Sequence, residues 1–122
     1  SNPFVSIGPI LNVPGVTEAI CQTDVPIIAV SPIVGGHAVK GPAAKMMAEL
    51  ALPVSPIGIA RHYYKFINGL VIDTKDTRLA DEIITTGVNV HVTNTIMNSA
   101  RTESNLAQET LQFAMSLSHK EV

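Results

Sequence analysis

Residues 25–47 read VPIIAVSPIVGGHAVKGPAAKMM, and this stretch decides the fold that the sequence predicts. It opens with an apolar, β-branched run at 26–30, passes through a proline- and glycine-rich loop at 31–41, and continues in a helical pattern that begins at Pro42. In α/β proteins a strand, a glycine loop and a helix start bind phosphate in this order, because unpaired N–H groups face outward beside the positive helix end. We therefore predict an anion-binding corner. Its candidate residues are Ser31, Gly35, Gly36, Gly41 and the cation Lys40.

The spacing of this loop differs from a Walker loop, which needs GxxxxGK followed by Ser or Thr, whereas Lys40 here precedes Gly41 and Pro42. The glycines alone therefore leave a purely structural loop open as the alternative. No histidine pair or Cys cluster has zinc-ligand spacing, and no Gly-x-Ser-x-Gly elbow is present. Any catalysis would fit phosphate chemistry with positioned donors and a metal better than a covalent nucleophile.

Composition sets the outer limits of the fold and function. The 122 residues make at most one domain, and 15% of them are charged, against roughly 25% in an ordinary soluble domain. With 46% apolar residues, we expect part of the surface to be covered by a subunit or by a missing part of the same protein. The net charge of −2 gives no basic field for nucleic acid, and no apolar run approaches the roughly 20 residues of a membrane span. The single Cys21 excludes an internal disulfide and suits a reducing cytoplasm.

Strand and helix patterns alternate along the rest of the chain, which predicts an α/β fold with a parallel sheet and helices on its faces. The expected elements are a structured loop at 1–15, helices at 16–23, from 42, at 56–67, from Asp76 to Gly87 and at 103–118, and strands at 26–30, 70–73 and 88–92. Ser55 and Asp76 are the expected helix caps. Three strands are too few for a self-sufficient sheet of this type.

Several positions have two interpretations. The small polar side chains of the first loop, with Gly8, suit phosphate or ribose contacts, or they satisfy their own backbone in Asx and Ser turns. Asp73 either faces a ligand crevice or caps the next turn. The cluster at 61–65 touches substrate or a partner, or it is a solvated helix face with one tyrosine buried. We expect Cys21, the methionine pair 46–47, and Leu50, Ile84 and Leu111 to face the core.

Four segments carry a family resemblance: SNPFVSIGPIL, AVSPIVGGHAVKGPAAKMMAEL, VIDT and VTNTIM. They resemble the C-terminal part of the 2-phospho-L-lactate transferases, which make the deazaflavin coenzyme F(420). The resemblance implies that residues 1–122 are the C-terminal portion of one Rossmann-like transferase domain. The implied reaction transfers the 2-phospholactyl group from lactyl-2-diphospho-5′-guanosine to the deazaflavin precursor FO (7,8-didemethyl-8-hydroxy-5-deazariboflavin), with Mg²⁺, releasing GMP. The implied protein is a cytoplasmic homodimer.

The resemblance also assigns residues. Ser1, Asn2, Ser6 and Gly8 match the family's loop near the nucleotide, and Gly35, Gly36, Lys40 and Gly41 match its second glycine loop. Lys40 would offset charge on the transferring phosphoryl group. The metal ligands and a first glycine-rich loop are expected before Ser1, so this piece alone should be inactive. Asn94 stands where many relatives have Asp. A lactyl or an enolpyruvyl donor remains open, as does a non-catalytic nucleotide-sugar-binding regulator of the same fold.

Overall fold

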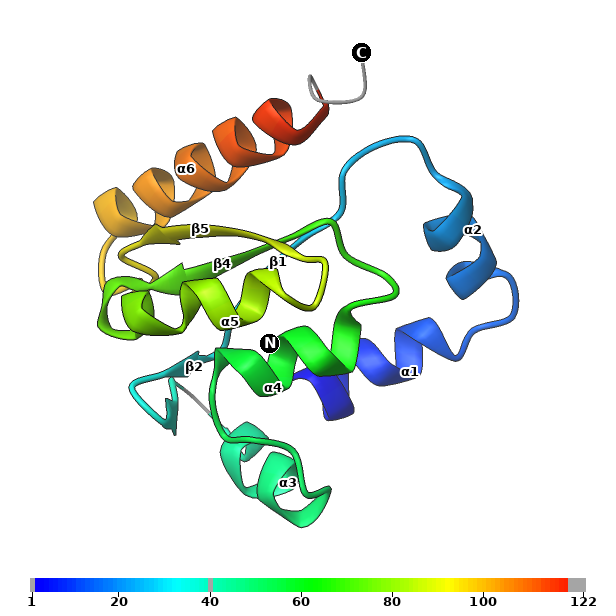
Figure 1. The fold of residues 1–122 in the computed structure, drawn as a ribbon, viewed down its shortest axis with the longest axis horizontal. Coiled ribbons are helices and arrows are strands. Elements are labelled where there is room, and N and C mark those ends of the chain that lie inside the picture. The colour runs from blue at the N-terminus through cyan, green and yellow to red at the C-terminus, as the bar shows by residue number, and fades with distance from the viewer. Residues whose placement is uncertain (1, 40, 119–122) are drawn as a thin grey trace.

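The computed structural model describes residues 2–39 and 41–118 and has the α/β architecture that the sequence predicts. A parallel sheet in the order β1-β4-β5 forms its centre, with Ala29 opposite Leu70 and Leu70 opposite Val90. The three strands are β1 (Ile28–Val30), β4 (Gly69–Asp73) and β5 (Asn89–Thr93). Helix α6 lies along one face of this sheet, and α4 and α5 lie on the other (Figure 1).

The remaining elements are short, apart from α6. They are the π-helical turn η1 (Pro3–Ile7), the helices α1 (Gly8–Leu11), α2 (Val16–Gln22), α3 (Ala43–Glu49), α4 (Pro56–Tyr63), α5 (Ala80–Ile84) and α6 (Ala100–Ser118), the 3₁₀ turn η2 (Thr74–Leu79), and the antiparallel pair β2 (Ile33–Val34) and β3 (His37–Ala38). The Ser55 hydroxyl accepts a hydrogen bond from the N–H of Ile57, which confirms the predicted cap of α4.

The core has two layers because alternate residues of a strand point to opposite faces of the sheet. Leu70 and Ile72 belong to the larger cluster, with Met47, Ile59 and Ile83. Val71 belongs to the smaller cluster, which α6 completes with Leu106, Phe113 and Leu117. All five residues of β4 are buried, as expected for a central strand covered on both faces.

The prediction of a loop at 1–15 was wrong, because η1 and α1 occupy residues 3–11. The side-chain oxygen of Asn2 accepts hydrogen bonds from the N–H groups of Phe4 and Val5, at 2.7 and 3.0 Å, and Pro3 takes the first turn. A capped start with proline in the first turn tolerates the residues that otherwise indicate a loop.

Four predicted core positions are exposed instead. Cys21 is exposed on α2, which packs beside α1 at the side of the molecule (Figure 1). Leu50 and Ile84 lie where α3 and α5 end, and Leu111 is 62% exposed on α6.

In the 61–65 cluster Tyr63 is buried whereas Arg61, Tyr64 and Lys65 are exposed. The interpretation of this cluster as a solvated helix face with one buried tyrosine therefore describes these side chains.

Within the described residues no single helix is long and apolar enough to cross a membrane. Residues Pro3–Leu11 and Val16–Gln22 together meet the length and composition, with an 87° bend between them.

Candidate functional site

The carboxyl ends of the three parallel strands meet at one edge of the sheet, which is where open α/β sheets bind ligands. Ser31 follows β1, Asp73 is the last residue of β4, and Asn94 follows β5. The glycine loop that the sequence singles out leaves this same edge. The strand order therefore brings the predicted corner and the polar strand ends together.

Asp73 links two of these strand ends. Its Oδ1 accepts hydrogen bonds from the Thr95 N–H at 2.9 Å and the Thr95 hydroxyl at 3.2 Å, and its Oδ2 accepts from the Lys75 N–H at 3.0 Å. Burial would raise the pKa of Asp73, but these donors, together with the Lys75 charge, hold the pKa below its ordinary value. Asp73 is 2% exposed and caps the next turn, as one of the two interpretations expected.

The 31–41 loop contains a feature that the sequence analysis missed, the hairpin β2–β3. Val34 pairs with His37, so Gly35 and Gly36 form a two-residue turn with φ angles of 58° and 86°. Two consecutive positive φ angles define the type I′ turns that suit such hairpins, and glycine adopts them without strain. The glycines therefore shape the turn whether or not they also contact a ligand.

A buried carboxylate holds this turn. The Gly35 N–H lies 3.1 Å from Oδ2 and 3.3 Å from Oδ1 of Asp76, which is 4% exposed. The expectation that Asp76 caps a helix was wrong. Asp76 instead has a non-helical conformation, φ −110° and ψ 17°, within η2. The Gly36 N–H makes no hydrogen bond to any residue in the ranges 2–39 and 41–118.

The other predicted site residues differ in burial and in their hydrogen-bond partners. Ser31 is buried, and its hydroxyl bonds the backbone of Ile33, so in this structure it shapes the entry to the hairpin. The oxygen of Asn2 is engaged in its own turn, while its side-chain nitrogen lies 3.8 Å from the Met46 sulfur on α3. Ser6 and Gly41 are exposed, and Gly8 is where η1 meets α1. Ser1 and Lys40 lie outside the described residues.

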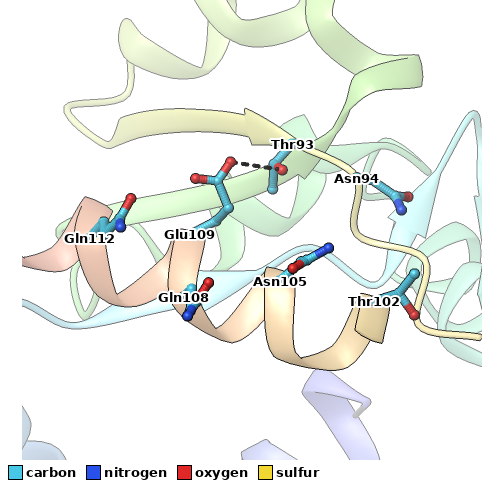
Figure 2. A pocket seen from close by; sticks show the side chains of 7 residues that line it. All are labelled: Thr93, Asn94, Thr102, Asn105, Gln108, Glu109 and Gln112. Atoms are coloured by element: carbon cyan, nitrogen blue, oxygen red, sulfur yellow. Dashed lines mark hydrogen bonds between the residues drawn. The ribbon is translucent and has the colours of Figure 1, made fainter. Parts of the chain in front are cut away.

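A polar cavity of about 340 Å³ lies beside the same edge, and sequence reasoning did not find it (Figure 2). It is lined by Thr93 and Asn94 at the end of β5 and by polar side chains of α6 from Thr102 to Gln112. Glu109 accepts a hydrogen bond from the Thr93 hydroxyl at 3.2 Å, drawn in Figure 2. No Lys or Arg lines this cavity, so its chemistry suits a neutral hydrogen-bonding group better than a phosphate.

The described residues do not by themselves fit a magnesium site. They contain no group of three or more His, Cys, Asp or Glu side chains that could hold a metal. Asp73 and Asp76 already accept hydrogen bonds from Thr95, Lys75 and Gly35, and Glu109 accepts one from Thr93.

The parallel sheet with its flanking helices gives this chain an open α/β architecture, the class in which ligands bind at the carboxyl ends of the strands. The sequence model described as 2-phospho-L-lactate transferase CofD matches residues 1–112. The chain belongs to this family, as the resemblance implied.

Individual relatives agree with this assignment. The chain is 41% identical over 109 residues to the 2-phospho-L-lactate transferase of Methanococcoides burtonii, covering 89% of this chain and 35% of that protein. It is 42% identical over 117 residues to that of Methanocaldococcus jannaschii, covering 96% and 36%. It is also 36% identical over 115 residues to the phosphoenolpyruvate transferase of Streptomyces griseus, covering 93% and 36%. The chain thus spans about a third of the length of these relatives.

Proposed function

We propose that the protein to which this chain belongs transfers the 2-phospholactyl group from lactyl-2-diphospho-5′-guanosine to FO, releasing GMP, in coenzyme F(420) biosynthesis. The family match over residues 1–112 carries this proposal. The relatives' names cover both a phospho-L-lactate and a phosphoenolpyruvate transferase, so the choice of donor is part of what must be tested. In a cell we expect the protein in the cytoplasm, with Mg²⁺ as cofactor and its ligands outside this chain.

The residues of the glycine loop have the central roles in the proposed mechanism. The donor's diphosphate would lie against the loops that contain Asn2 and Gly36, with Lys40 offsetting charge on the transferring phosphoryl group and on departing GMP. The terminal hydroxyl of FO would attack in line. In such transfers positioning and electrostatic stabilisation supply most of the barrier reduction.

The decisive assay uses the complete protein with FO, Mg²⁺ and either the lactyl or the enolpyruvyl guanosine donor, and detects the product by mass. Formation of the phospholactyl product and GMP is expected. Lys40→Ala should reduce turnover at least about 100-fold if the ammonium stabilises transition-state charge. Lys45→Ala, which removes an exposed cation of α3, is the matched control and should leave turnover unchanged. No product with either donor would refute the proposal, and full turnover of Lys40→Ala would remove Lys40 from the mechanism.

An apolar groove of about 570 Å³ lies between β1 and α6 and offers a contact surface for another part of the protein or a second copy. Its lining includes Ile28, Val30, Met97, Leu106, Leu111 and Ala114. Beside it the strand β1 pairs only with β4 in the described sheet. The Ser31 N–H donates to the Val71 carbonyl and the Ile27 carbonyl accepts from the Asn68 N–H, so the backbone groups of Ile28 and Val30 point to the open side.

We propose that a segment of the complete protein outside residues 1–122 fills this groove and pairs with β1, since the relatives are about three times as long. In the complete protein Leu111→Glu should then lower the free energy of unfolding by about 2 kcal/mol or more, because the charge would be buried. Ile84→Glu, at a 53% exposed position outside the groove, should change it by less than about 0.5 kcal/mol.

Equal, small effects of the two substitutions would refute this occupant. A second copy would be the occupant instead if Leu111→Glu converted a dimer to a stable monomer in light scattering. The proposed homodimer is tested by the same measurement on the unsubstituted protein.

A further inference from the structure

The hydrogen bond between Asp76 and Gly35 joins two segments that are 41 residues apart in the sequence. One is the turn of the glycine hairpin, and the other is the loop that follows the central strand β4. A carboxylate that is almost fully buried is costly unless its oxygens are hydrogen-bonded. Among the described residues the donor that satisfies Asp76 is the backbone of Gly35, so the two segments hold each other in place.

The two glycines of the turn therefore have different environments. The Gly35 N–H is engaged by Asp76, whereas the Gly36 N–H makes no hydrogen bond within residues 2–39 and 41–118. The side chain of Lys75 lies close to the same turn, since a Cβ on Gly35 would be 3.9 Å from the Lys75 Cδ. A two-residue turn with few other contacts would otherwise sample several conformations, because glycine has the widest backbone freedom.

We propose that Asp76 is a positioning residue: by binding the Gly35 N–H it fixes the hairpin turn so that the Gly36 N–H is presented to the donor's diphosphate. This assignment rests on the proposed function, and it gives the two glycines separate roles. Gly35 anchors the turn, and Gly36 binds the ligand. Because the turn is ordered before the donor arrives, binding does not have to order it.

The test compares three variants of the complete protein. Asp76→Ala removes the acceptor, and Asp76→Asn keeps one acceptor oxygen but loses the charge. Asp81→Ala removes an exposed carboxylate of the adjacent helix α5 and is the matched control. Asp76→Ala should raise the KM for the guanosine donor about ten-fold, which is about 1.4 kcal/mol. The KM for FO should stay within two-fold, Asp76→Asn should recover most of the loss, and Asp81→Ala should match the unsubstituted protein.

Amide hydrogen exchange gives a second readout that does not depend on the reaction. The Gly35 amide should exchange at least ten-fold faster in Asp76→Ala, and about five-fold faster in Asp76→Asn, because a neutral acceptor binds the N–H less strongly than a carboxylate. Should Asp76→Ala fail to fold, Asp76→Asn carries the test through the Gly35 exchange rate, which should still be about five-fold faster than in the unsubstituted protein.

The outcomes separate the two proposals. An unchanged Gly35 exchange rate in either variant overturns the positioning role. Faster exchange in Asp76→Ala with an unchanged donor KM overturns it too, because the bond would then be purely structural. If the unsubstituted protein forms no phospholactyl product, the proposed function fails. The exchange rate then still decides whether Asp76 fixes the turn, and inorganic pyrophosphate replaces the donor as the ligand whose affinity is measured.

Discussion

Replacing Asp73 should destabilise the protein more than any other single change at the candidate site. Asp73→Ala removes both acceptor oxygens and leaves the N–H and hydroxyl of buried Thr95 without their partner. Hydrogen bonds to a charged group contribute about 1.5–3 kcal/mol each, so the loss of these two bonds should lower the free energy of unfolding by about 3–6 kcal/mol. The Lys75 N–H adds little, because Lys75 is exposed and water can replace the carboxylate.

Denaturant unfolding of the complete protein measures this effect, with Asp81→Asn as the exposed control, for which a change below about 0.5 kcal/mol is expected. Asp73→Asn should lose an intermediate amount of stability, since its amide group must face one of the N–H donors.

The pKa of Asp73 is lower in the folded than in the unfolded state. Its stabilisation is therefore complete above a pH of about 4 and is lost as the pH falls through the folded pKa. A loss below about 1 kcal/mol for Asp73→Ala, or an unchanged acid transition, would refute this account.

Two further predictions concern the helix α4. Gly58→Ala should destabilise the protein by about 3 kcal/mol or more in denaturant unfolding. The added Cβ would overlap the Pro53 carbonyl oxygen and lie 2.6 Å from the Met47 Cε. A loss of stability under about 1 kcal/mol would contradict this close packing. Tyr63→Phe should be neutral or stabilising by up to about 1 kcal/mol, because the buried Tyr63 hydroxyl has no hydrogen-bond partner among the described residues. Burial raises the pKa of Tyr63 to about 12. The protein should therefore lose stability as the pH rises from about 10 to 12, because in this range the tyrosine ionises more readily in the unfolded than in the folded state. Unfolding of Tyr63→Phe measured across the same range should not show this loss.

The sequence predicted two strands of the sheet well, and 70–73 and 88–92 match β4 and β5 to within a residue. The buried strand β4 is a short apolar run, and β5 alternates valine with polar residues. The sequence analysis missed the hairpin, since strands of two residues have no period to detect. The bond from Asp76 to Gly35 was equally out of reach, because no local pattern connects residues 41 positions apart. The only local sequence signal for this bond is that a second aspartate, Asp76, follows the strand-ending Asp73 by three residues.

The misplacement of Leu111 and the low charge content have one physical origin. Helical spacing put Leu111 on the buried stripe of α6, yet it is exposed beside Met97 along the groove at β1. A helix whose apolar surface is wider than the sheet beneath it either packs against a second element or leaves large side chains in water. The 15% charged content predicted a covered surface without locating it. The proposed occupant of the groove would cover that surface at β1 and α6, so Leu111→Glu is the substitution that tests the expectation from composition and the proposal from the structure together.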